Sequence, residues 1–164
     1  DILGVIQYMA EVLERSPQAF AGMGEEDLRM HFLVLLNGVY EGAASGETFN
    51  AGGKADIILP SGGGNVFVAE CKFWSGGKAF GGIIDQLFRY ITWRDTKVAI
   101  LLFSRNKDFS SVVEAAQVAA EAHPQFKRRI VYESANGFRG VYGHPDDANR
   151  DVTVTTLVFD VPTD

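Results

Sequence analysis

Three charged residues, Asp56, Glu70 and Lys72, stand in a part of the chain that is mostly apolar or rich in glycine, with Lys54 as its one other charged residue. Carboxylate oxygens are the ligands that hard divalent cations such as Mg²⁺ prefer in proteins. A lysine ammonium group neutralises negative charge that builds on a phosphate in a transition state. Two carboxylates and one ammonium group are therefore the side chains needed to hydrolyse a phosphodiester with a metal-activated water.

Two strands are expected to carry these residues, over 54–59 and 65–73. Side chains alternate between the two faces of a strand, so Glu70 and Lys72 share a face with Val66 and Val68. On the earlier strand Asp56 shares its face with Ile58. On each strand the charged side chains share a face with apolar ones and lie towards the end away from the turn, as expected at the open end of a half-buried hairpin.

The turn Pro60-Ser61-Gly62-Gly63-Gly64 is expected to fold the two strands against each other. Asp56 then faces either Val68 or Glu70. Like charges on paired strands are destabilising, and a bound Mg²⁺ or Mn²⁺ would compensate them. Lys72 adds a positive charge and, with a lowered pKa, would orient or deprotonate the water. The alternative is that Asp56 ends a turn and that Glu70 and Lys72 form a surface ion pair.

The remaining elements follow from the hydrophobic periodicity. The run Val98 to Phe103 is continuously apolar, which is typical of a strand buried on both faces. The order of elements predicts an α/β fold with a mixed central β-sheet flanked by helices, in one domain over 1–164. Helices are expected over 2–15, 25–40, 79–93 and 109–122, and strands over 47–49, 54–59, 65–73, 98–103, 129–133, 137–142 and 152–161.

Composition limits the class of protein. Of the 164 residues, 46% are hydrophobic and 22% are charged, which is ordinary for a soluble domain. The chain has neither an apolar run of about 18 residues nor a secretory signal, so no membrane partner is expected. The single cysteine, Cys71, excludes an internal disulfide and fits a reducing, cytoplasmic setting. Because the chain begins at Asp1 rather than at a methionine, we expect it to be excised from a longer parent with further domains.

Charge is distributed unevenly along the chain. The net charge is −6, yet residues 72–107 hold seven basic and two acidic side chains. This middle segment would meet a polyanion locally, although a solvated basic face explains the same charge.

The segment Gly53-Lys54-Ala55-Asp56-Ile57-Ile58, followed by Val68-Ala69-Glu70-Cys71-Lys72, resembles the PD-(D/E)xK motif of the restriction-endonuclease-like nuclease superfamily. Ala55 stands where the motif has proline. The order of elements over about residues 25–104 resembles the αβββαβ core of that superfamily, with extra strands after it. The resemblance implies a Mg²⁺-dependent deoxyribonuclease, more specifically an endonuclease of a restriction or phage-defence protein. It implies metal ligation by Asp56, Glu70 and the Cys71 carbonyl, with Lys72 catalytic.

Two extensions of the site follow from the same resemblance. Many members place a glutamate on the helix before the sheet, where Glu25 and Glu26 stand, and we prefer Glu26 as a further catalytic and metal-binding residue. Both acids equally suit a helix N-terminus. Gln86 and Tyr90 repeat the QxxxY pattern of an exonuclease-like branch and share a helix face. Gln86 would contact the attacking water or a phosphate and Tyr90 the DNA, unless this face is simply polar with Tyr90 half-buried.

Further contacts with nucleic acid are expected from Lys78, in a glycine-rich link, and from Arg94. Trp74 and Trp93 would stack on bases, although packing in the core is the commoner role of tryptophan. Glu47 is a weaker acidic candidate. His31, His123 and His144 lack metal-ligand spacing, and the basic run Lys127-Arg128-Arg129 is more often solvated than functional.

The leading hypothesis is therefore a nuclease that hydrolyses DNA. The alternative is a catalytically silent nuclease-like module that binds nucleic acid or protein, and a third reading is a structural domain whose acidic hairpin binds a cation. The choice between DNA and RNA, between endo- and exonuclease, and between monomer and homodimer stays open.

Overall fold

One seven-stranded sheet, with strand order β1-β2-β3-β4-β7-β6-β5, runs through the computed structural model. The structure describes residues 2–40, 45–50, 53–61, 64–95 and 97–163. β4 lies parallel to both β3 and β7 and the other pairs are antiparallel, so the expected mixed sheet is confirmed. The strands are β1 (Ser45–Asn50), β2 (Gly53–Ser61), β3 (Gly64–Phe73), β4 (Lys97–Ser104), β5 (Phe126–Ile130), β6 (Gly137–His144) and β7 (Asp147–Asp160).

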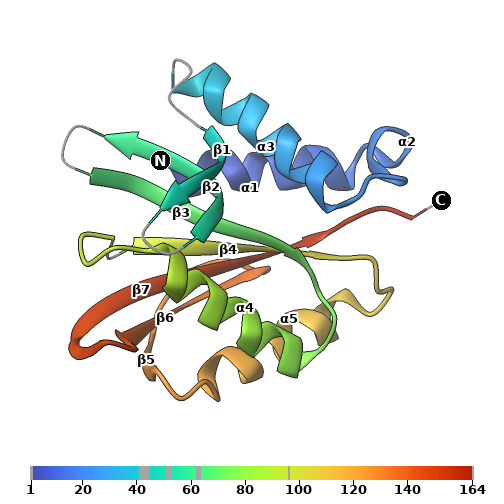
Figure 1. Ribbon diagram of the computed structural model, residues 1–164. Coiled ribbons are helices and arrows are strands. Elements are labelled where there is room, and N and C mark those ends of the chain that lie inside the picture. The colour runs from blue at the N-terminus through green and yellow to red at the C-terminus, as the bar shows by residue number, and fades with distance from the viewer. Residues whose placement is uncertain (1, 41–44, 51–52, 62–63, 96, 164) are drawn as a thin grey trace.

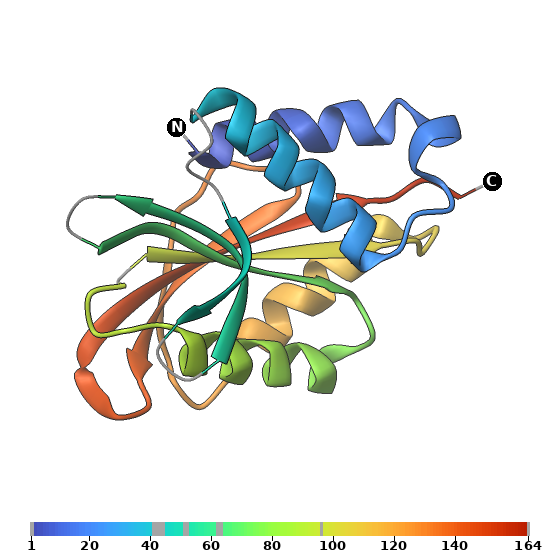
Figure 2. The same cartoon turned by 45° about the horizontal axis from the view of Figure 1, so that its top comes forward.

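Helices cover both faces of this sheet, as Figure 1 shows. One face is covered by α1 and α3 and the opposite face by α4 and α5, and both views agree on this division (Figures 1 and 2). None of the helices in the described ranges is long and apolar enough to cross a bilayer. The helices are α1 (Ile2–Glu14), α2 (Pro17–Phe20), α3 (Glu25–Val39), α4 (Gly77–Tyr90) and α5 (Phe109–Glu121).

Two apolar cores, one on each face, hold β3 and β4 between them. On the side of α1 and α3, Phe32 is fully buried and stacks on Phe103 of β4 and Phe159 of β7, with ring centroids 6.0 and 5.3 Å apart. On the other side α4 packs Phe80 and Ile84 against Ile58 and Val68. β4 is buried on both faces throughout Val98–Ser104, as its apolar sequence predicted.

The helices begin where local chemistry favours them. Three acids, Glu25, Glu26 and Asp27, occupy the first turn of α3, where the helix dipole stabilises negative charge. α4 starts after Gly76. The φ angle of Gly76 is 105°, a backbone conformation that residues other than glycine rarely adopt. The glycine-rich link therefore allows the sharp turn between β3 and the helix that covers it.

The strand expected over 129–133 begins earlier, at Phe126, and ends at Ile130. Packing explains the shift, because the Phe126 ring lies against that of Tyr142 with centroids 5.5 Å apart and the two residues pair across β5 and β6. Val131, placed inside the expected strand, is exposed. Periodicity alone did not reveal this cross-strand partner.

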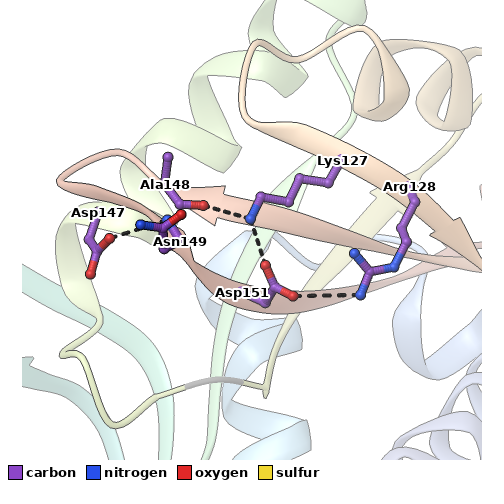
Figure 3. Close-up of polar contacts among 6 residues, drawn as sticks. All are labelled: Lys127, Arg128, Asp147, Ala148, Asn149 and Asp151. Atoms are coloured by element: carbon purple, nitrogen blue, oxygen red, sulfur yellow. Dashed lines mark hydrogen bonds and ion pairs between the residues drawn. The ribbon is translucent and has the colours of Figure 1, made fainter.

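The basic run at the start of β5 is neutralised by acids. Lys127 Nζ lies 2.6 Å from Asp151 Oδ1 and also donates to the Ala148 carbonyl, and Arg128 lies 3.5 Å from the same carboxylate (Figure 3). At the adjacent turn the Asn149 N–H donates to Asp147 Oδ1. Arg129 pairs with Glu121 at 2.7 Å. This run is therefore not an unpaired basic patch.

Replacing Phe32 by alanine should lower the free energy of unfolding by about 3–5 kcal/mol, because the change empties space between two other buried rings. Val34→Ala, on the same helix at a side chain that is 65% exposed, should change it by no more than about 0.5 kcal/mol. Urea denaturation followed by circular dichroism measures both. Equal losses in the two variants would contradict this assignment of the core.

Candidate active site

The second half of β2 pairs with the first half of β3, and the two strands then part. The register runs from Ser61↔Gly64 to Ile57↔Ala69. Beyond Ala69, β3 continues beside β4 as far as Phe73↔Phe103, whereas the first half of β2 curves away with β1 (Figure 2). Continuing the β2–β3 register places Asp56 level with Glu70, which decides between the two partners considered for Asp56.

Two carboxylates occupy the edge of β3 that β2 leaves open. Asp56 Oδ2 accepts a hydrogen bond of 2.8 Å from the Cys71 N–H, and Glu25 Oε2 accepts one of 3.0 Å from the Phe73 N–H. The Trp74 N–H instead donates to the Phe103 carbonyl of β4. Because the N–H and C=O of one strand residue face the same neighbour, the Cys71 carbonyl faces the opening that holds Asp56.

Glu70 is the most deeply buried charged group of the site. It is 2% exposed, and its Oε2 atom has no hydrogen-bond partner among the described residues. Burial and, next, the negative charge of Asp56 raise the pKa of Glu70 to about 8, against the opposing effect of Lys72. A hydrogen bond joins the two side chains and raises the pKa of Glu70 while lowering that of Asp56. At neutral pH, with no cation bound, Glu70 therefore holds a proton and donates it towards the Asp56 carboxylate.

Nearby hydrogen-bond donors and positive charges offset part of the burial of Asp56. Burial raises the pKa of its carboxyl group, but the Cys71 N–H and the Arg29 guanidinium oppose that rise. Arg29, on α3, is only 7% exposed and was not singled out from the sequence. A signal was present, because Arg29 follows Glu25 by one helical turn and stands between Leu28 and Phe32 of the buried stripe.

Lys72 is held by Glu25, with Nζ 3.4 Å from Oε1. Burial alone lowers the pKa of Lys72, but Glu25, Glu70 and Asp56 together outweigh it and the pKa is raised. The lysine is therefore a firmly protonated ammonium group. The hypothesis that a lowered pKa lets Lys72 deprotonate a water has no support in this geometry.

The helix carboxylate at the site is Glu25, so the preference for Glu26 is corrected. Glu25 touches both Lys72 and the backbone of Phe73, whereas Glu26 is exposed. The choice depends on the rotation of α3 about its axis. That rotation is fixed by Leu28, Phe32 and Leu36 in the core, far from the acids themselves.

None of the described contacts joins the side chains of the other expected residues to this centre. Gln86 Nε2 donates to Tyr90 Oη, and Tyr90 packs, partly buried, against the core beneath α4. Lys78 is exposed in the first turn of α4. Cys71 is buried in the core, as its apolar strand face predicted. The side chain of Glu47 lies outside the described residues.

The tryptophans differ from each other. Trp74 packs beside Phe80 with centroids 6.2 Å apart, as expected for a core residue. Trp93 is 60% exposed, which corrects the expectation of core packing, and the Arg94 guanidinium lies 4.1 Å from the centre of its ring.

The donor set fits a hard cation better than zinc. Within the described residues, no three His, Cys, Asp or Glu side chains gather as a metal-ligand cluster. Mg²⁺ is often held by one or two carboxylates and retains several waters, so Asp56, Glu70 and the Cys71 carbonyl suffice for it. The unpartnered Glu70 Oε2 atom is a buried oxygen with lone pairs available for such an ion.

Comparison of the chain with protein-family models, with curated proteins and with solved structures found no match.

The raised pKa of Glu70 makes stability depend on pH in a defined direction. Between pH 4.5 and 8 the unfolded chain loses the Glu70 proton and the folded chain keeps it, so stability falls as pH rises through this window. Without divalent cations, Glu70→Gln should therefore gain roughly 2–4 kcal/mol relative to wild type between pH 5 and 8.5. Urea unfolding in EDTA measures this difference. A difference that stays constant with pH would show that Glu70 ionises normally.

Proposed function

We propose that this chain is a divalent-cation-dependent nuclease of the PD-(D/E)xK type that hydrolyses phosphodiester bonds in DNA. The observation that carries the proposal is the buried Glu70, with an unpartnered oxygen, beside the half-buried Asp56 at the fork between β2 and β3. Two carboxylates side by side in an apolar setting are destabilising unless a proton or a cation joins them. Lys72, beside this pair, supplies the positive charge that a phosphate requires.

The residues have distinct roles in this proposal. Asp56, Glu70 and the Cys71 carbonyl would hold Mg²⁺ or Mn²⁺. When bound, the ion would supply Lewis-acid chemistry, neutralising phosphate charge and making a water more acidic. Asp56 is already oriented by the Cys71 N–H, so little side-chain freedom is lost on binding. Glu70 must first release its proton.

Lys72 acts as a fixed cation. Its ammonium group, oriented by Glu25, stabilises negative charge on the phosphoryl oxygens as the bond to the leaving oxygen breaks. Glu25 is a positioning residue, because it touches Lys72 and the Phe73 N–H rather than the reacting atoms. A lysine with a raised pKa suits electrostatic stabilisation and not proton abstraction.

DNA rather than RNA as substrate, endonucleolytic cleavage, and a place in a restriction or phage-defence protein of the cytoplasm belong to the proposal by resemblance. The buried, unpaired thiol of Cys71 suits a reducing compartment.

Removing either the Asp56 carboxylate or the Lys72 ammonium group should nearly abolish cleavage. Asp56→Ala and Lys72→Ala should each lower the rate of plasmid nicking in Mg²⁺ or Mn²⁺ by about 100-fold or more, because the first loses a metal ligand and the second loses phosphate stabilisation. Agarose gel electrophoresis of supercoiled and linear DNA measures the rate. A matched set of an RNA and a DNA oligonucleotide of one sequence determines the preferred backbone.

Neighbouring acids on α3 provide the control. Glu25→Gln should lower the rate roughly tenfold, as loss of a positioning partner does, while Glu26→Gln should leave it unchanged. Cleavage that survives in Asp56→Ala would place the activity elsewhere. A wild-type chain that binds DNA but never cleaves it, with either cation, would favour the silent module.

Binding of Mg²⁺ should release about one proton per site at pH 7, because Glu70 must ionise to become a ligand. The affinity should therefore rise between pH 6 and 8 and level off above. Isothermal titration calorimetry in two buffers of different ionisation enthalpy measures the proton count. Binding that releases no proton, or that is as tight in Glu70→Gln, would remove Glu70 from the ligand set.

A further inference from the structure

An exposed aromatic residue stands in the turn that follows α4. Trp93 follows α4 and leaves 60% of its surface accessible, the largest exposed fraction of any aromatic side chain in the described parts of the chain apart from Tyr8 at 62%. The Arg94 guanidinium lies over its ring, 4.1 Å from the centroid. This pair is not explained by the core or by the carboxylate pair.

The turn that presents Trp93 is firmly held. Asp95, 3% exposed, accepts hydrogen bonds from the Thr92 N–H at 2.8 Å and from its hydroxyl at 3.2 Å. The Asp95 N–H donates back to the Thr92 carbonyl, which also accepts a bond of 3.0 Å from Arg150 Nη2 on β7. Trp93 and Arg94 therefore project from a turn that is ordered before any partner arrives.

Charge around the pair favours a polyanion. Arg89, Arg94 and Lys97 are exposed within nine residues of sequence, and Asp95, the acid of the same segment, is buried in the turn, while Asp85 and Asp146 line a pocket together with Arg89. The ion pairs found in the described residues do not include these three cations, unlike the neutralised run Lys127-Arg128-Arg129. A docked protein would need acids of its own here, whereas a polynucleotide brings both phosphates and flat rings.

We propose that Trp93 and Arg94 form a stacking platform for an unpaired nucleotide of a nucleic-acid strand. The inference deepens the proposed nuclease function and rests on it only for the choice of polynucleotide as ligand. An unpaired base adds to the stack on the indole or on the planar guanidinium, and the charge of Arg94 attracts the phosphates of the same strand. A base inside a duplex is already stacked and does not bind in this way. The platform therefore selects single-stranded regions or frayed ends.

Fluorescence tests the platform directly. In a Trp74→Phe variant, Trp93 is the only tryptophan, and a 15-nucleotide oligothymidylate in EDTA should quench its emission. A blunt duplex of equal length should quench it less. Oligouridylate in the same titration separates RNA from DNA as the source of the unpaired base. Fluorescence anisotropy of a dye-labelled oligothymidylate measures the variants that lack Trp93. The expected dissociation constant rises roughly tenfold or more in Trp93→Ala and changes little in Trp93→Phe, which keeps a ring to stack on.

Two comparisons make the result decisive. Arg94→Ala should weaken binding of the oligothymidylate, while Lys107→Ala, an exposed cation of the same basic segment, should have a smaller effect. Thermal melting confirms that the variants fold. Unchanged affinity in a folded Trp93→Ala variant, or equal quenching by duplex and single strand, would overturn the platform.

The platform and the nuclease proposal fail in different ways. Asp56→Ala should lose cleavage and keep the quenching of Trp93. Quenching without any cleavage by the wild-type chain would leave the platform standing and remove the enzyme. Cleavage that is unaffected in Trp93→Ala, together with unchanged binding, would remove the platform and leave the enzyme.

Discussion

Two carboxylates, the half-buried Asp56 and the buried Glu70, lie side by side where two strands part, and the free-energy cost of that arrangement is the constraint on the candidate site. An ionised pair in an apolar setting loses hydration and repels itself. In the absence of a cation the pair is stabilised by one proton, held by Glu70, whose pKa is raised to about 8. In the proposed nuclease a divalent ion would take the place of that proton. The exchange would then depend on pH near neutrality.

The fork in the sheet makes the arrangement possible. A continuous β2–β3 ladder would pair the Cys71 and Phe73 amides with backbone carbonyls and leave no room for side chains. Because β2 pairs with β3 only from Ile57 onward, Asp56 and Glu25 accept those two hydrogen bonds instead. β3 remains in place because β4 pairs with its other edge and because its side chains pack into an apolar core on each face of the sheet. The rigid part of the fold thus supports an opening at the site.

Outside the site, some basic side chains are paired with acids and others are exposed to solvent. Basic residues of β5 are matched by Asp151 and Glu121, so they contribute to structure and little to any external field. The exposed cations near Trp93 in sequence would meet the phosphates of the proposed nucleic-acid strand. A net charge of −6 is therefore compatible with a local surface that attracts phosphates.

The sequence by itself determined the elements and the trio of charged residues. Alternation along a strand and the glycine-rich turn are local, so they place Asp56, Glu70 and Lys72 near one another without knowledge of the rest of the chain. Only the tertiary structure decided that Glu25 and not Glu26 reaches Lys72, that Arg29 lies buried beside Asp56, that β5 begins at Phe126, and that Trp93 is exposed. Each of these depends on how a helix is rotated or which ring a strand meets. Such contacts join segments far apart in sequence, so periodicity within one segment does not identify the partner, even where it hints at burial as for Arg29.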